Sequence, residues 1–187
     1  MYGLFEMKIS LRPDRLRACA AAAVMACAIA VAGPNSALAE TAAPVTSADA
    51  MFAASFKEPG GTVQKFDQLK GKVSVVYFWA TWCEPCQKEA PQLKALFEKY
   101  RDKGLNVVGI AMDNADKVKE FAAKNELTFT VVYGGREAMQ LSKDLGNSLG
   151  GIPFLVVIGR DGKIVERLTG ETKDGRVEGI VAPLLGG

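Results

Sequence analysis

Apolar residues along this 187-residue chain follow two kinds of pattern. Residues 73–79 form an unbroken run of mostly β-branched and aromatic side chains, which predicts a strand buried on both faces. Between Cys86 and Lys103, apolar side chains recur three and four residues apart and Gly104 follows, as is typical of an amphipathic helix and its end. The same criteria predict strands at 105–112, 129–133, 153–158 and 163–169, and helices at 116–125, 137–145 and 174–185.

The order of these elements favours an α/β domain. Strands and helices alternate through most of the chain, and the last two strands are joined by Gly159-Arg160-Asp161-Gly162, a hairpin signal. We therefore expect a central mixed β-sheet flanked by helices, with an antiparallel edge. The chain shows no internal repeat, and Gly150-Gly151 lacks the spacing of a phosphate-binding loop.

The first 39 residues have the organisation of an export signal. A basic region at 12–17 precedes an apolar stretch at 18–32 that is short for a membrane span, and Ala37-Leu38-Ala39 has the pattern of a cleavage site. We predict a signal peptide at 1–39, a mature chain that begins near Glu40 and a periplasmic location. Three alternatives stay open: an uncleaved membrane anchor, a lipid on Cys27, or a start at Met7.

The charge and composition of residues 40–187 bear on the kind of partner and on the domain organisation. Four of the 23 basic and two of the 21 acidic residues lie in 1–39, so residues 40–187 carry 19 of each and are formally neutral. This balance gives no electrostatic reason to expect nucleic acid as a partner. Residues 40–50 are rich in small and polar residues and predict a flexible linker. Residues 51–187 are long enough for one domain, which we expect to be monomeric.

Two cysteines follow the buried strand. Cleavage of the signal would remove Cys19 and Cys27 and leave Cys83 and Cys86. Their C-x-x-C spacing lets two thiols close a disulfide within one helical turn, and Pro85 suits the first turn of a helix. A thiolate is the nucleophile of disulfide exchange, and a helix N-terminus in this context lowers a cysteine pKa from about 8.5 to roughly 3.5–7.5. The segment therefore predicts reversible thiol–disulfide exchange.

Over residues 52–182 the chain resembles the thioredoxin-like superfamily, most closely its exported TlpA/ResA/CcmG branch. C-x-x-C alone is a weak signal because zinc and haem sites share it, but C-x-x-C after a buried strand, with Ile-Pro ahead of a later strand, is a strong one. The resemblance implies a thioredoxin-like fold. The matching segments are Gly71-Lys72, Phe78-Trp79-Ala80-Thr81-Trp82-Cys83-Glu84-Pro85-Cys86, Glu89, Pro91, Gly151-Ile152-Pro153 and Asp161-Gly162-Lys163.

The resemblance also implies roles for individual residues. Cys83 would attack a partner, and Cys86 would resolve the mixed disulfide. Pro153 matches the family's cis-proline, which packs beside the cysteines and leaves the backbone at Ile152 free to pair with a partner's extended chain. Trp82 matches an exposed tryptophan beside the active site. Together with Ile152, the expected partner-binding surface comprises Trp82, Glu84 and Pro85.

Two glutamates of the motif region add electrostatic expectations. Glu89 lies three residues after Cys86 and shares its side of the helix, so the resemblance makes it a candidate active-site carboxylate that holds up a cysteine pKa or handles a proton. The alternative is a solvated glutamate on the helix face. Thioredoxin itself has a buried Asp where this chain has Tyr77, so any such role would pass to Glu89. Glu84 favours the thiol over the thiolate by a small like-charge effect.

Other classes of protein fit the chain less well. A purely structural disulfide would constrain the unfolded chain little across so short a loop. Copper(I) or zinc binding by a metallochaperone would use the same two thiolates, but the chain has no histidine and two cysteines leave a tetrahedral site half empty. The T-x-x-C site of a peroxiredoxin is absent, because Thr81 stands only two residues before Cys83. The absence of histidine also excludes Ser/His and Cys/His hydrolase arrangements.

We therefore expect an exported thiol–disulfide oxidoreductase that reduces disulfides of specific proteins. The resemblance implies substrates in cytochrome c or copper-site maturation and a DsbD/CcdA-like membrane thiol donor as the source of electrons. Apart from the redox-active disulfide itself, no cofactor and no metal is expected. A disulfide oxidase or isomerase stays open, since a reduction potential is not encoded in any local pattern.

Overall fold

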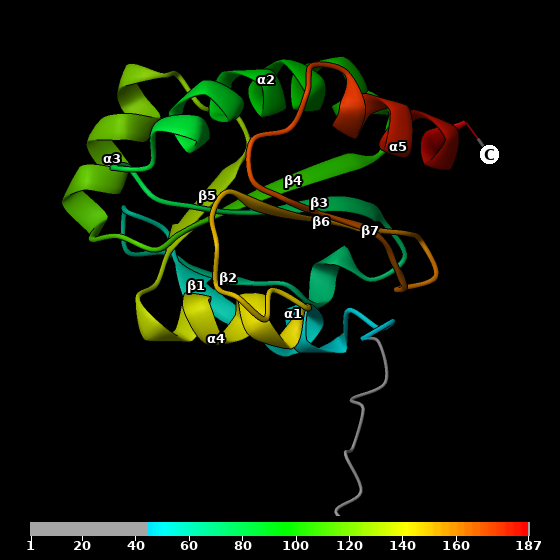
Figure 1. Ribbon diagram of the computed structural model, residues 1–187, viewed down its shortest axis with the longest axis horizontal. Coiled ribbons are helices and arrows are strands. Elements are labelled where there is room, and N and C mark those ends of the chain that lie inside the picture. Colours follow the sequence, from blue (N-terminus) through cyan, green and yellow to red (C-terminus); the bar gives the residue numbers. More distant parts are fainter. Residues whose placement is uncertain (1–44, 187) are drawn as a thin grey trace, which may run out of the picture. The chain divides into compact units, whose positions relative to one another are not determined.

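The computed structural model describes residues 45–186, so the predicted signal peptide and the first part of the predicted linker lie outside it. Within this range the chain forms a seven-stranded mixed sheet in the order β2-β1-β5-β4-β3-β6-β7 (Figure 1). The strands are β1 (Ser55–Lys57), β2 (Val63–Lys65), β3 (Val73–Trp79), β4 (Leu105–Ala111), β5 (Thr130–Tyr133), β6 (Phe154–Ile158) and β7 (Ile164–Thr169). The helices are α1 (Asp49–Ala53), α2 (Glu84–Tyr100), α3 (Ala115–Lys124), α4 (Arg136–Asp144) and α5 (Arg176–Leu185), with short 3-10 helices η1 (Asp67–Leu69) and η2 (Arg101–Lys103).

The central strand of the sheet is β3, and every one of its residues is buried. It pairs with β4 in parallel and with β6 in antiparallel, and β7 continues the antiparallel side. This arrangement confirms the predicted mixed sheet with an antiparallel edge. In the β3–β6 register Phe78 lies opposite Phe154. The carboxyl end of β3 is therefore next to the beginning of β6, which brings the two family motifs to the same end of the sheet.

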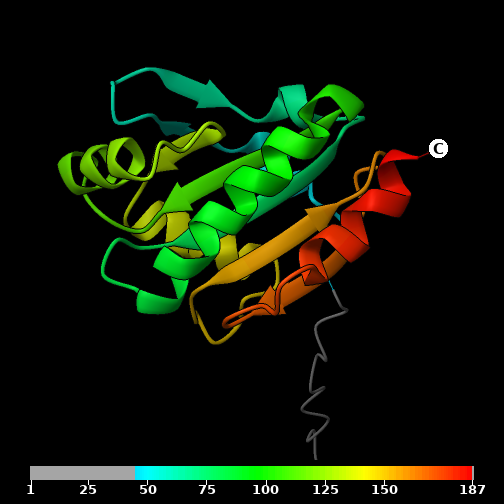
Figure 2. The ribbon, with the colours of Figure 1, turned by 90° about the horizontal axis from the view of Figure 1, so that it is seen from above.

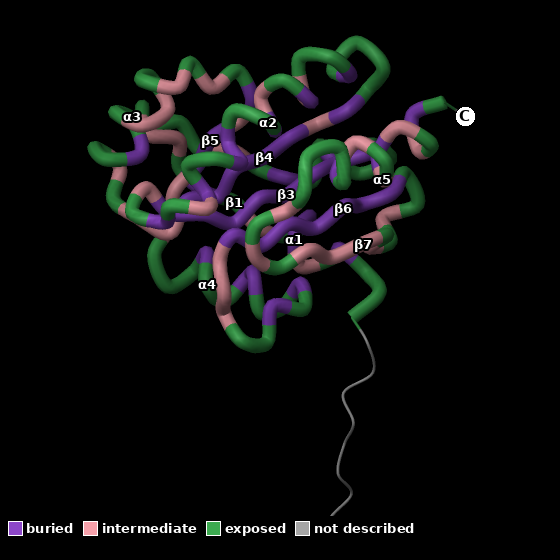
Figure 3. The backbone as a smooth tube through the Cα atoms, turned by 45° about the horizontal axis from the view of Figure 1, so that its top comes forward, coloured by how far each residue is buried: buried purple, intermediate pink, exposed green. Residues whose placement is uncertain are grey.

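Helices cover both faces of the sheet. Helices α2, α3 and α5 lie on one face and α1 and α4 on the other (Figures 1 and 2). Successive residues of β3 serve the two layers in turn: Val75 and Tyr77 join the cluster under α2 and α5, whereas Val76 and Phe78 join the cluster over α1 and α4. Figure 3 shows the resulting buried centre. Because both faces are covered, β3 carries an unbroken apolar run.

The N-terminal boundary differs from the prediction. The amide of Ala48 donates to the carbonyl of Gly162 at 3.0 Å, and the amide of Ile164 donates to the carbonyl of Thr46 at 2.8 Å. Ala48 is also fully buried, and α1 begins at Asp49. The expectation of a flexible linker was therefore wrong for residues 46–50, because the backbone of this segment pairs with the turn between β6 and β7.

Most predicted elements agree with the structure to within two residues, and the largest shift is at α2. This helix begins at Glu84 instead of Cys86 and ends at Tyr100, after which η2 replaces its predicted last turn. The chain then leaves through Gly104 in a left-handed conformation, with φ at 92°. That conformation is one that glycine adopts without a steric penalty, which explains why the predicted end of the helical segment was right.

Candidate active site

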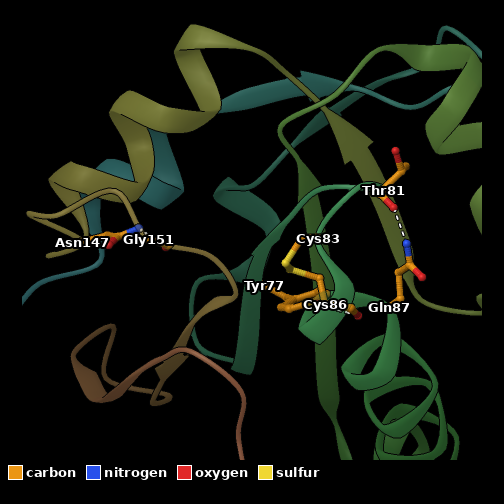
Figure 4. The surroundings of a disulfide bond; sticks show 7 residues. All are labelled: Tyr77, Thr81, Cys83, Cys86, Gln87, Asn147 and Gly151. Carbon is orange, nitrogen blue, oxygen red and sulfur yellow. Dashed lines mark hydrogen bonds between the residues drawn. A yellow bond between two sulfur atoms is a disulfide. The ribbon is translucent and has the colours of Figure 1, made fainter.

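The two cysteines lie where β3 passes into α2. Cys83 precedes the first residue of α2 in an extended conformation, and Pro85 occupies the first turn, where its missing N–H removes no helical hydrogen bond. The cysteines form a disulfide with an S–S distance of 2.07 Å and a Cα–Cα distance of 5.2 Å (Figure 4). The sequence prediction of a cysteine pair at a helix N-terminus is confirmed.

The two cysteines differ in solvent exposure. Cys83 retains 5% of its surface, whereas Cys86 is fully buried. Their neighbour Trp82 is 68% exposed, as the resemblance implies, and Trp79 belongs to the core. A large protein partner can therefore meet the surface at Trp82 and Cys83, while Cys86 lies behind them.

The helix N-terminus is a mixed electrostatic environment. Its dipole favours a thiolate at Cys83, and the exposed carboxylate of Glu84 opposes it by like-charge repulsion. Glu84 forms an ion pair with Lys88 at 3.0 Å, and both side chains are solvent-exposed. An exposed pair of this kind contributes little to stability. The Lys88 ammonium does, however, offset part of the Glu84 charge near the cysteines.

Tyr77 supports the helix from beneath. Its hydroxyl donates to the carbonyl of Cys86 at 2.9 Å (Figure 4). Its ring stacks parallel to that of Trp79. Burial raises the pKa of Tyr77 well above its ordinary value, and the nearby Glu89 raises it further. Tyr77 is therefore a neutral hydrogen-bond donor at physiological pH. A hydrogen bond of this kind contributes on the order of 1 kcal/mol to stability.

Glu89 is buried, with only 3% of its surface exposed. One of its carboxylate oxygens accepts a hydrogen bond from the Thr172 hydroxyl, and its other oxygen, Oε2, has no partner within residues 45–186. Burial raises the pKa of Glu89; the hydrogen bond from Thr172 counteracts this in part, and the Glu171 carboxylate adds to it. The solvated-surface alternative is thus contradicted. Glu89 is instead a buried carboxyl on the helix that carries Cys86.

A groove of about 340 Å³ reaches Glu89 from the side of α5. It lies between α2 and the segment from Thr172 to Glu178, and Lys99 and Lys173 are also part of its wall. The groove therefore borders the buried carboxyl on its α5 side. Glu89 is thus a buried carboxylic acid on the helix that carries Cys86, which makes it the candidate proton carrier of the site.

Pro153 completes the cysteine end of the sheet. The peptide bond between Ile152 and Pro153 is cis, as the resemblance implies, and the carbonyl of Pro153 accepts from the amide of Gly170 at 2.8 Å. Ile152 packs against the core cluster that contains both cysteines. In the part of the chain that the structure describes, the backbone of Ile152 has no backbone hydrogen-bond partner.

A family profile decides the classification. The profile of the Redoxin family matches residues 39–183, which is most of the chain. The chain belongs to the Redoxin family.

Individual relatives agree with this assignment. The chain is 36% identical over 115 residues to a "Thiol-disulfide oxidoreductase ResA" of Bacillus cereus, a match that covers 60% of this chain and 64% of the relative. Identity to the protein of the same name from Oceanobacillus iheyensis is 35% over 121 residues, covering 64% of this chain and 60% of the relative. The chain thus spans less than two thirds of the length of these curated relatives.

Solved structures show that the fold is thioredoxin-like. A putative thiol:disulfide interchange protein DsbE from Chlorobium tepidum superposes with a TM-score of 0.64 at 27% identity, covering 71% of this chain and 92% of that protein. A thioredoxin-family thiol:disulfide interchange protein from Chlorobium tepidum TLS gives a TM-score of 0.67 at 25% identity, covering 77% and 98%.

Three residues that hold this Redoxin-family site, Asp113, Gln87 and Thr172, had no signal in the sequence. The Thr81 hydroxyl donates to the carboxylate of Asp113. The Thr81 carbonyl accepts from Gln87 Nε2 at 2.7 Å (Figure 4). The loop that carries Trp82 is therefore held from two sides. Thr172, which holds Glu89, follows β7 in an irregular segment. The contacts from Asp113 and Thr172 join segments that lie 32 and 83 residues apart in the sequence, so no local spacing predicts them.

The described part of this family member lacks two further features. Among residues 45–186, no three acidic, cysteine or histidine side chains converge on a point that could hold a metal ion. Nor does any helix in that range have the length and apolar character needed to cross a bilayer.

Proposed function

We propose that this chain is an exported thiol–disulfide oxidoreductase that reduces disulfides in specific protein partners. The observation that carries the proposal is the Cys83–Cys86 disulfide at the N-terminus of α2, at the same end of the sheet as the cis-proline and the unpaired backbone of Ile152. The names of the relatives, thiol-disulfide oxidoreductase and thiol:disulfide interchange protein, support it.

The proposed reaction transfers two electrons from the cysteine pair to a partner. The Cys83 thiolate attacks one sulfur of the partner's disulfide, and the other partner sulfur leaves and takes up a proton. Cys86 then loses its proton and attacks the Cys83 sulfur, which closes the Cys83–Cys86 disulfide and releases the second partner thiol. Glu89 is the proposed acceptor of the Cys86 proton. A membrane thiol carrier of the DsbD/CcdA-like type would return the pair to its reduced form.

The direction of electron flow is supported by the two glutamates near the pair. Glu84 and an ionised Glu89 both disfavour a thiolate, and a less stable thiolate makes the dithiol a stronger reductant. We propose cytochrome c or copper-site maturation proteins as substrates, since the sequence resembles the branch that serves them. This extension rests on the resemblance, whereas the exchange chemistry rests on the site.

Redox titration tests the proposed direction. We expect the Cys83–Cys86 couple to have a reduction potential below about −200 mV, on the reducing side of protein disulfide isomerase at about −180 mV. The measurement equilibrates residues 40–187 with dithiothreitol mixtures of known ratio and counts free thiols by mass spectrometry. The Cys83→Ser/Cys86→Ser double variant is the blank. A potential near that of the oxidant DsbA, at about −120 mV, would contradict a reductase and favour an oxidase.

Export is a separate part of the proposal. It is supported by the signal-like pattern of residues 1–39 and by the start of the family match at residue 39. We expect the mature protein to begin at Glu40, as the intact mass of the secreted material would show. A diacylglyceryl mass on Cys27, or retention of residues 1–39, would instead place the domain on the membrane.

A further inference from the structure

The segment that precedes the cis-proline is held by a buried side chain. Asn147 is only 3% exposed, and its Nδ2 donates to the carbonyl of Gly151 at 2.9 Å (Figure 4). The backbone N–H of Asn147 donates to the carbonyl of Ser142 at 2.9 Å, which connects the residue to the last turn of α4. Asn147 thus connects a rigid helix to the peptide group immediately before Ile152.

Because a peptide group is planar, the hydrogen bond from Asn147 also fixes the direction of the Ile152 N–H. The carbonyl of Gly151 and the N–H of Ile152 belong to one peptide group, and this group is trans, since the bond between Ile152 and Pro153 is the cis peptide of the described chain. In a planar trans peptide the C=O and N–H point in opposite directions. Because Asn147 draws the carbonyl toward the interior, the Ile152 N–H must point away from Asn147, where it has no backbone partner among residues 45–186.

The backbone of this loop needs such a constraint. Gly150 and Gly151 directly precede Ile152, and Gly150 has φ at +68°. Glycine peptides rotate easily because no Cβ limits them. The far end of the loop is fixed separately, where Arg167 Nε donates to the carbonyl of Leu145 at 2.7 Å. Between Leu145 and Ile152, Asn147 is the described side chain that hydrogen-bonds to the loop backbone.

We propose that Asn147 is a positioning residue for partner binding, which aims the Ile152 N–H at a backbone carbonyl of an extended segment of the protein substrate. The partner segment is the chain next to the disulfide cysteine that Cys83 attacks. This inference rests on the proposed function and adds to it a residue outside the C-x-x-C and Ile-Pro motifs. It concerns recognition of a peptide backbone, so it does not apply to a disulfide that carries no peptide.

That distinction supplies the test. The dithiol form of residues 40–187 is mixed with one of two substrates. The first is a synthetic peptide that contains one intramolecular disulfide, and the second is 2-hydroxyethyl disulfide, which has no amide groups. Asn147→Asp keeps the size of the side chain but replaces the donor with a carboxylate that repels the Gly151 carbonyl, and Asn147→Ala removes the contact altogether. We expect the second-order rate constant for the peptide to fall about tenfold in both variants. The rate with 2-hydroxyethyl disulfide should change by less than about twofold.

Asn125→Asp is the matched control. Asn125 Nδ2 also donates to a backbone carbonyl four residues away, that of Phe121 at 2.9 Å, but it does so at the end of α3. This variant should keep both rates. The ratio of the two rate constants is taken within one sample, so partial unfolding of a variant cancels.

Each outcome separates the two levels of the proposal. Equal loss with both disulfides in the Asn147 variants, or no loss with either, would overturn the positioning role while leaving the exchange activity in place. Failure of the unmodified protein to reduce either disulfide would overturn the proposed function itself, together with the inference that depends on it.

Discussion

Replacing Cys86 with serine should cause covalent adducts with partner proteins to accumulate. If Cys83 attacks and Cys86 resolves, the serine variant forms the mixed disulfide but lacks the thiol that breaks it. Resolution within one protein is fast because the two groups are held together, and effective molarities of well-oriented groups reach about 10⁵ M or more. Loss of that step should prolong the adduct by orders of magnitude. We expect at least about tenfold more adduct than with Cys83→Ser.

The asymmetry follows from the positions of the two residues. In Cys83→Ser the thiol that remains at the site is Cys86, which is fully buried within the first turn of α2. A protein disulfide cannot reach it without displacement of the helix N-terminus. Adducts are collected from cells after acid quenching, separated without reductant and identified by mass spectrometry, and dithiothreitol should release them.

The Cys83→Ser/Cys86→Ser double variant reports any background association. Equal amounts of adduct from the two single variants would contradict the assigned roles. An absence of adducts from both, in cells that make the natural partners, would favour a structural disulfide or a metal site. The identity of the captured proteins distinguishes a cytochrome maturation substrate from a copper-site assembly protein, and it can reveal the electron donor.

The central part of the fold could be predicted because its elements carry local patterns. The seven residues of β3 are all apolar or small and all buried, and the apolar face of α2 recurs at helical spacing through Leu93 and Leu96. The hairpin between β6 and β7 follows from Gly159 and Gly162. Each of these signals lies within the element that it predicts, so no knowledge of distant contacts was needed.

Elements that depend on distant contacts could not be predicted in the same way. Residues 46–50 resemble a linker in composition, and only their pairing with residues 162–164 makes them part of the domain. The active site contains two such long-range dependences. Burial of Glu89 depends on Thr172 from the segment after β7, and the position of Trp82 depends on Asp113 after β4. Neither spacing nor residue type indicates which loop will arrive there.

The family resemblance singles out Glu89 as a candidate active-site carboxylate, but it does not show whether the side chain is buried or solvated. Helical spacing places Glu89 on the side of Cys86, yet it is equally compatible with a solvated glutamate. The structure adds burial and an oxygen that has no partner within residues 45–186. Those features make Glu89 a group whose charge acts at short range in a medium of low polarity, where electrostatic effects are strongest.

Glu89→Gln should therefore shift the pH dependence of thiol alkylation to lower pH. Glutamine keeps the size of the side chain and an oxygen for Thr172, but it carries no charge. Burial raises the pKa of Glu89, with Glu171 adding to the shift and Thr172 opposing it. Below that pKa the unmodified carboxyl is neutral and the two proteins should react alike. Above it, the carboxylate disfavours a nearby thiolate, so the unmodified protein needs a higher pH to reach the same reactivity.

The expected shift in the alkylation midpoint is about one pH unit, because two charges in a partly buried site interact by about 1 kcal/mol or more and about 1.36 kcal/mol corresponds to one unit. Iodoacetamide labelling of the reduced proteins across a pH series, followed by peptide mapping, measures it for Cys83 and Cys86 separately. Glu98→Gln is the matched control: Glu98 lies on the same helix and also accepts a threonine hydroxyl, that of Thr128 at 3.2 Å, but it is exposed and far from the cysteines. Superimposable curves for Glu89→Gln and the unmodified protein would remove Glu89 from the proton path, and Cys86 would then have to lose its proton directly to solvent.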